Sequence, residues 1–177
     1  SKFKHGIKIY GNTNYSNILS NKYINLPFKK NVFQSSSKTY VNNFLKNEKK
    51  RKSKIIEIHN RPNYLKYFKD IVTSKIIFYF HNDPLSMNGS KTIADRMFIL
   101  NLCKKIIFNS EWTKDRFFIG IDKFYLHSER TEVICQSTDR VSVNLKHKKK
   151  IIMFVGKLNK SKGYDLFGKA VIRVLNE

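Results

Sequence analysis

Three groups of polar side chains stand directly after apolar runs, and they hold most of the residues in this chain that could do chemistry. The groups are His59-Asn60-Arg61, His81-Asn82-Asp83 and Asn109-Ser110-Glu111. Apolar runs of this length are typical of strands in a parallel sheet that is covered on both faces. Ligands of such sheets bind beyond the carboxyl ends of the strands. We therefore expect the three groups to line one crevice.

His81 is the candidate with the clearest chemistry. It follows five apolar residues and precedes a loop with Pro84, so its imidazole is expected at the rim of the sheet. There it could hydrogen-bond a substrate or act as an acid or a base. The alternative is that His81 closes the strand by satisfying a backbone carbonyl. His59 has the same two interpretations, with Arg61 helping to fix its own loop, and Ser110 is predicted to cap a helix.

A second candidate site is a basic loop near the end of the chain, in the segment IIMFVGKLNKSKGYDLFGKAVIRVL. Gly156, Lys157, Lys162 and Gly163 lie between a predicted strand and a predicted helix. Free N–H groups at a helix N-terminus carry partial positive charge, and two ammonium groups beside them would bind a diphosphate. The spacing matches neither GxxxxGK[ST] nor GxGxxG. The alternative is that both lysines are solvated loop residues in a lysine-rich chain.

Apolar patterns predict the elements that position these residues. Strands are expected at residues 7–10, 55–59, 76–81, 106–109, 131–135 and 151–155, and a further apolar segment spans residues 23–28. Helices are expected at residues 38–46, 64–71 and 90–104, after residue 110 and after residue 163. Ser90 is the predicted N-cap of the helix at residues 90–104. Strands that alternate with helices over short connections favour right-handed crossovers, and so predict an α/β fold in which a parallel sheet has helices on both faces.

The net charge of +22, from 35 basic and 13 acidic residues, allows two explanations. One is a polyanionic partner, either a nucleic acid or the surface of an anionic membrane. The other is a bias of composition, because Asn, Ile, Phe and Tyr are over-used together with Lys. The lysines are spread along the chain, with runs only at residues 46–54 and 146–150, which favours the second explanation.

Several classes of site are disfavoured by what the sequence lacks. Cys103 and Cys135 stand far apart in apolar contexts, so we expect two buried, reduced thiols in a cytoplasmic protein and no structural zinc site. No apolar run approaches the roughly 18–20 residues that cross a bilayer. The chain has no DxD motif for a metal-bridged nucleotide and no GxSxG nucleophile elbow.

Five segments of the chain, taken in order, resemble glycosyltransferase family 4, a family of retaining enzymes with the two-domain GT-B architecture. The segments are IIEIHNRP (residues 55–62), FYFHNDPLSMNGSKT (78–92), IIFNSEWTKDRF (106–117), TEVICQSTD (131–139) and FVGKLNKSKGYDLFGKA (154–170). The resemblance covers the chain from Ile55 to its end. It implies that residues 1–145 form a Rossmann-like acceptor-side domain without its first strand. Residues 146–177 would then be the linker and the first strand, loop and helix of the donor-binding domain.

The resemblance also implies a reaction and its residues. A sugar would pass from a nucleotide-sugar donor to a glycan or lipid-linked acceptor with retention, without a metal or other cofactor. His81 matches the family's histidine near the transferred sugar. Gly156-Lys157 and Lys162-Gly163 match the loop that binds the donor diphosphate. Lys157 replaces the usual arginine, which keeps the charge but loses the bidentate fork.

The resemblance further implies where the protein works and what it lacks. We expect a role in lipopolysaccharide or polysaccharide synthesis in the cytoplasm, with contact to the inner face of an anionic membrane. In the family His is followed directly by Asp, whereas here Asn82 separates His81 from Asp83. The family's pair of donor-site glutamates is not found in this sequence. We therefore expect a fragment that is inactive alone.

The alternative function is a basic nucleic-acid-binding α/β domain. Such a domain needs aromatic side chains interleaved with basic ones on an exposed surface. Most of the 14 Phe and 9 Tyr residues stand in apolar strand or helix patterns instead. The sequence therefore disfavours nucleic acid as the partner.

Overall fold

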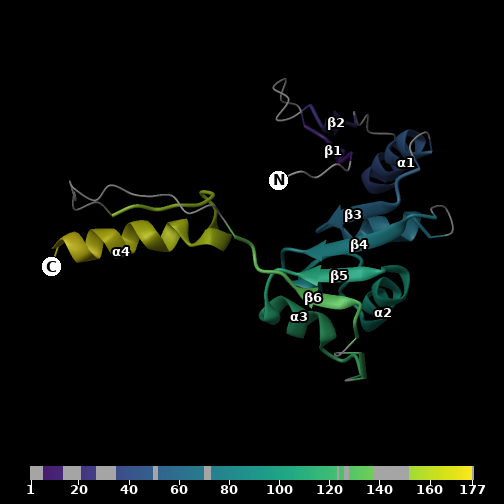
Figure 1. The fold of residues 1–177 in the computed structure, drawn as a ribbon. Coiled ribbons are helices and arrows are strands. Elements are labelled where there is room, and N and C mark those ends of the chain that lie inside the picture. The colour runs from purple at the N-terminus through teal and green to yellow at the C-terminus, as the bar shows by residue number, and fades with distance from the viewer. Residues whose placement is uncertain are drawn as a thin grey trace. The chain divides into compact units, whose positions relative to one another are not determined.

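The structure, a computed structural model, describes residues 6–13, 21–26, 35–49, 52–69, 73–122, 124–125, 128–137 and 152–176 (Figure 1). The chain divides into two compact units, Ser1–Ser137 and Thr138–Glu177. The predicted boundary between residues 145 and 146 lies in the segment 138–150, outside the described residues. Each unit is therefore described by itself.

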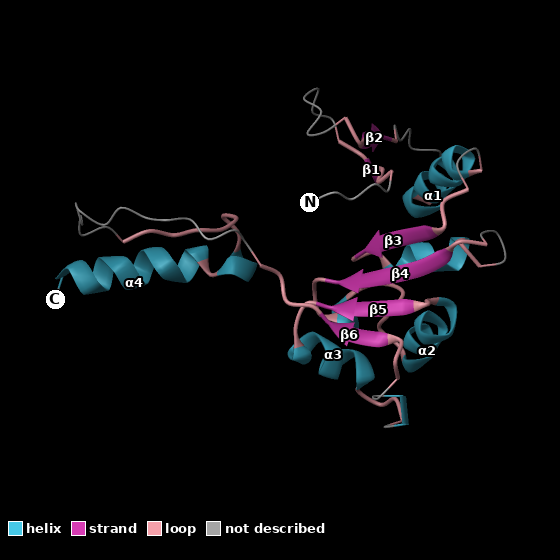
Figure 2. Cartoon of the chain, in the orientation of Figure 1, coloured by secondary structure: helices cyan, strands magenta, loops and turns pink. Residues whose placement is uncertain are grey.

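The first unit is built on a parallel sheet of four strands, in the order β3-β4-β5-β6 (Figure 2). The strands are β3 (Ile55–His59), β4 (Lys75–Phe80), β5 (Lys105–Phe108) and β6 (Thr131–Val133). All three neighbouring pairs are parallel, so the carboxyl ends of the four strands lie at the same edge. The helices that flank the sheet are α1 (Ser36–Glu48), α2 (Ile93–Leu102) and α3 (Glu111–Phe118). The predicted α/β class with a Rossmann-like parallel sheet is confirmed.

The rest of the unit consists of short elements. β1 (Ile9–Gly11) and β2 (Tyr23–Asn25) pair in parallel as a separate two-stranded sheet. Two 3₁₀ turns, η1 (Pro62–Tyr67) and η2 (Pro84–Ser86), follow β3 and β4. The helix predicted at residues 64–71 is a 3₁₀ helix that begins earlier, at Pro62, since proline suits the first position of a helix; residues 70 and 71 lie outside the described part.

Alternate side chains of the strands form the core. Phe78, Phe80 and Phe108 are fully buried and pack in one cluster with buried residues of all three helices. The ring of Phe117 from α3 lies 5.3 Å from the rings of both Phe80 and Phe108. Burying each such side chain stabilises the fold by about 1.5–3 kcal/mol. These contacts fix α3 beside the ends of β4 and β5.

The opposite face of β3 and β4 is more accessible. Glu57 and His59 are exposed and Tyr79 is half-buried, whereas the intervening strand residues are buried. His59 pairs directly with Tyr79 in the register of the two strands, so their side chains stand side by side. This face therefore carries polar and aromatic groups up to the edge where the strands end.

Two sequence predictions about single residues are wrong. Thr92, not Ser90, caps α2: its hydroxyl accepts from the Asp95 N–H, and the Asp95 carboxylate accepts from the Thr92 N–H, as in a capping box. Ser90 is instead fully buried in the preceding loop. Cys135 is exposed, because it follows the short edge strand β6, whereas Cys103 is buried as predicted. The prediction that Ser110 caps α3 is confirmed.

The second unit contains a loop and a helix. Helix α4 (Tyr164–Asn176) follows the short turn η4 (Lys160–Lys162), as predicted. Residues 152–155 have no strand pairing among the described residues, which differs from the strand expected at 151–155, while residue 151 lies outside the described part. The ring of Phe154 lies 5.3 Å from that of Phe167, so this segment packs against α4.

Candidate functional site

The ends of β3 and β4 bring two histidines together. His59 Nδ1 lies 3.0 Å from His81 Nε2, which is hydrogen-bonding distance. The two ring planes differ by 11° and their centroids are 5.3 Å apart, so the imidazoles meet edge to edge in nearly one plane. The ring of Tyr79 is near-parallel to both. The first two of the three predicted groups therefore do share one place at the sheet edge.

The outer nitrogens of this histidine pair also have polar neighbours. Gln136 Nε2 lies 2.9 Å from His81 Nδ1, and Glu57 Oε2 lies 3.6 Å from His59 Nε2. Gln136 was not predicted as a site residue. It stands three residues after β6 with no motif around it, and only the strand order explains how it reaches His81.

The backbone of His81 is held from both sides. Its N–H donates to Asn60 Oδ1 at 3.3 Å, and its carbonyl accepts from Asn109 Nδ2 at 3.0 Å. Asn60 has a φ of 55°, in the left-handed region that asparagine tolerates better than most residues. Asn109 Oδ1 in turn accepts from the Thr113 hydroxyl at 2.7 Å. The third predicted group thus contributes Asn109 as a support for His81.

Asp83 pairs with α3 and does not face the histidines. Its two carboxylate oxygens accept from Arg116 Nε at 3.2 Å and Nη2 at 3.0 Å, a bidentate contact. The hydrogen bond from Arg116 lowers the pKa of Asp83. Asp83 Oδ1 also accepts from the Leu85 N–H at the start of η2. Asp83 therefore ties the loop after His81 to α3.

The rest of that loop is held by buried contacts. The Ser90 hydroxyl donates to the Pro84 carbonyl at 2.6 Å. Arg96, only 2% exposed, donates to the carbonyls of Ser90, Lys91 and Ile119. Gly89 has a φ of 93°, and a Cβ there would lie 2.6 Å from the Asn63 backbone nitrogen. These contacts hold the loop that follows His81 in place.

The electrostatic surroundings keep His81 neutral. Burial lowers its pKa below the ordinary value of 6.5, and the neighbouring His59 lowers the pKa further. Burial raises the pKa of Tyr79, with smaller contributions from Glu57 and Glu132. Both effects favour the neutral form of His81, which can donate from one ring nitrogen and accept at the other.

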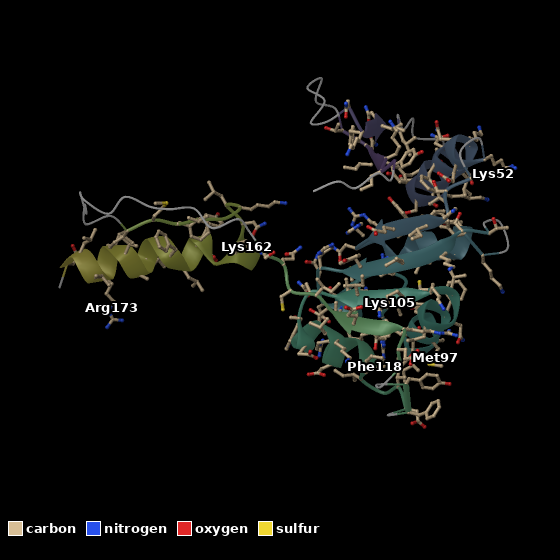
Figure 3. The ribbon with its side chains drawn as sticks, viewed as in Figure 1. Lys52, Met97, Lys105, Phe118, Lys162 and Arg173 are labelled. Carbon is tan, nitrogen blue, oxygen red and sulfur yellow. The ribbon has the colours of Figure 1, made fainter. Side chains whose placement is uncertain are left out.

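The basic loop of the second unit folds back on itself. A Cβ on Gly156 would lie 3.9 Å from the Cβ of Lys162, so the two ends of the predicted diphosphate loop are close. Figure 3 labels Lys162 in this loop. Gly163 has a φ of 71° and leads into α4. Gly156, Lys157 and Lys162 are all exposed. The geometry brings the predicted residues into one loop at a helix N-terminus.

Comparisons with models of protein families, with curated proteins and with solved structures found no match. Among the described residues, no group of three or more His, Cys, Asp or Glu side chains is placed to hold a metal ion. None of the helices in the described ranges has the length and apolar character to cross a membrane.

Proposed function

We propose that this chain belongs to a retaining glycosyltransferase that moves a sugar from a nucleotide-sugar donor to a glycan or lipid-linked acceptor. The observation that carries the proposal is the hydrogen-bonded His59–His81 pair at the carboxyl edge of a parallel sheet, where such folds bind ligands. His81 would hydrogen-bond the transferred sugar. The fixed loop between Asp83 and Arg96 would form one wall of that site.

In the proposed reaction Lys157 and Lys162 bind the donor diphosphate with the free N–H groups at the start of α4. Charge builds on the diphosphate as the glycosidic bond breaks, and the two ammonium groups stabilise that charge. The acceptor hydroxyl attacks the face that the leaving group vacates, so the configuration is retained. We place this activity in the cytoplasm, at the inner face of an anionic membrane, without a bound metal.

Substitution of Lys162 tests the leaving-group role. In a polypeptide that contains this sequence and transfers sugar, Lys162→Ala should lower kcat by about 10²-fold, because one charged donor to the leaving group is lost. Lys162→Arg keeps the charge and should retain most of the rate. Lys169→Ala, an exposed lysine further along α4, is the matched control. Equal rates for Lys162→Ala and this control would contradict the proposal.

A second candidate function is nucleic-acid binding, which the net charge of +22 favours. It predicts that affinity for single-stranded DNA or RNA falls steeply as salt increases, since each neutralised phosphate releases counterions. Filter binding or fluorescence anisotropy over a salt series measures this slope. No binding at low salt would remove this candidate and leave the glycosyltransferase.

A further inference from the structure

Four side chains form a continuous polar row across the sheet edge: Glu57, His59, His81 and Gln136. The contacts are Glu57 Oε2 to His59 Nε2 at 3.6 Å, His59 Nδ1 to His81 Nε2 at 3.0 Å, and His81 Nδ1 to Gln136 Nε2 at 2.9 Å. Every ring nitrogen of the two histidines therefore has one polar neighbour. A neutral imidazole carries one proton, so each ring donates from one nitrogen and accepts at the other.

The Glu57 end of the row is the looser one. Glu57 Oε2 lies 3.6 Å from His59 Nε2, which is beyond hydrogen-bonding distance. A carboxylate nevertheless favours a ring nitrogen that carries a proton, so this end is compatible with a proton on His59 Nε2 and an acceptor at His59 Nδ1.

The Gln136 end of the row sets the direction of donation. An amide nitrogen can only donate, and Gln136 Nε2 is the atom that faces His81 Nδ1. His81 Nδ1 is therefore an acceptor and His81 Nε2 carries the proton. The amide from the segment after β6 therefore selects the tautomer of His81, whose Nε2–H donates to His59 Nδ1.

We infer that His59 is a positioning residue that fixes His81 as its Nε2–H tautomer, so that His81 presents Nδ1 as a hydrogen-bond acceptor to a hydroxyl of the substrate. Gln136 is exposed, and its amide occupies the position that such a hydroxyl would take. The backbone of His81 is held by Asn60 and Asn109, so His59 acts on the ring alone. The assignment of this hydroxyl to a sugar rests on the proposed function, whereas the assignment of the tautomer does not.

The direct test is NMR of the whole chain labelled with ¹⁵N-histidine, at about pH 8 where imidazoles are neutral. We expect one proton bonded to His81 Nε2, with a ¹⁵N–¹⁵N coupling through the hydrogen bond to His59 Nδ1. His59→Leu should abolish this signal. His59→Asn places Oδ1 where Nδ1 lies and should keep the proton on His81 Nε2. A proton on His59 Nδ1 or His81 Nδ1, or an unchanged signal in His59→Leu, would overturn the inference.

Sugar transfer tests the second half of the inference. His81→Asn keeps an acceptor near the position of Nδ1, whereas His81→Gln places its amide near Nε2. We expect His81→Asn to retain at least tenfold more kcat/KM than His81→Gln, and His59→Leu to lower kcat/KM about tenfold with recovery in His59→Asn. Equal activity of the two His81 variants would overturn the acceptor role. These rates are measured in a polypeptide that contains this sequence and the donor-site segments that the family requires. If no such polypeptide transfers sugar while the NMR result holds, the proposed function fails and the tautomer stands.

Discussion

At the scale of single residues, His81 makes the stability of the fold depend on pH. Burial and His59 lower its pKa below 6.5 in the folded chain, so between the folded pKa and about 6.5 the unfolded chain binds more protons. The contribution of neutral His81 to the free energy of unfolding is present above about pH 6.5, and it is lost as the pH falls through the pKa of His81 in the folded chain.

This loss of stability at low pH can be measured. We expect the free energy of unfolding of the chain, from urea titrations, to decrease as the pH falls below about 6.5. His81→Asn removes the titrating ring and should flatten the curve in this range. If His81→Asn kept the full slope of the free energy of unfolding against pH, another group would be responsible. Lys66→Ala, which changes an exposed residue of η1, is the control.

At the scale of elements, helix caps and turns determine how firmly the loop between His81 and α2 is held. Thr92→Ala should destabilise the first unit by about 1 kcal/mol, because the Asp95 N–H loses its acceptor at the start of α2. Thr92→Ser keeps a hydroxyl and should be close to neutral. Thermal or urea unfolding measures both, and equal stability of the two variants would contradict the capping role.

Two glycines of the same unit form a matched pair. Gly89→Ala should cost about 2 kcal/mol or more, since the residue has a positive φ and its new Cβ would meet the Asn63 backbone. Gly120→Ala has a similar φ of 77°, but its new Cβ would meet the flexible end of Ile93. We expect Gly89→Ala to be clearly the worse of the two in urea unfolding. If Gly120→Ala were the more destabilising variant, the loop at Gly89 would accommodate a Cβ more easily than the structure indicates.

The positions of β3, β4 and β5 could be predicted because each strand consists mainly of apolar residues between polar segments, most clearly IIFYF in β4. The meeting of His59 and His81 also followed from the sequence, since the carboxyl ends of parallel strands share one edge. Gln136 could not be predicted, because its role comes from the position of an edge strand and not from a motif. Thr92 could have been found: Asp95 three residues later is the signature of a capping box, and it distinguishes Thr92 from Ser90.

At the scale of the whole molecule, the charge of +22 opposes the compact state. Basic side chains repel one another when the chain folds, and salt at about 0.1 M screens charges more than about 10 Å apart. We expect the urea midpoint to rise as potassium chloride is raised from about 0.05 to 0.5 M. A midpoint that falls with salt would show that attractive ion pairs, such as Arg116 with Asp83, outweigh the repulsion.

The register of β3 against β4 has a practical consequence. His59 lies opposite Tyr79, and a slip by one residue would turn His59 to the other side of the sheet, away from His81. The shared imidazole proton would then vanish. That single resonance is therefore a reporter of correct strand pairing, and it could be followed during refolding without any knowledge of the substrate.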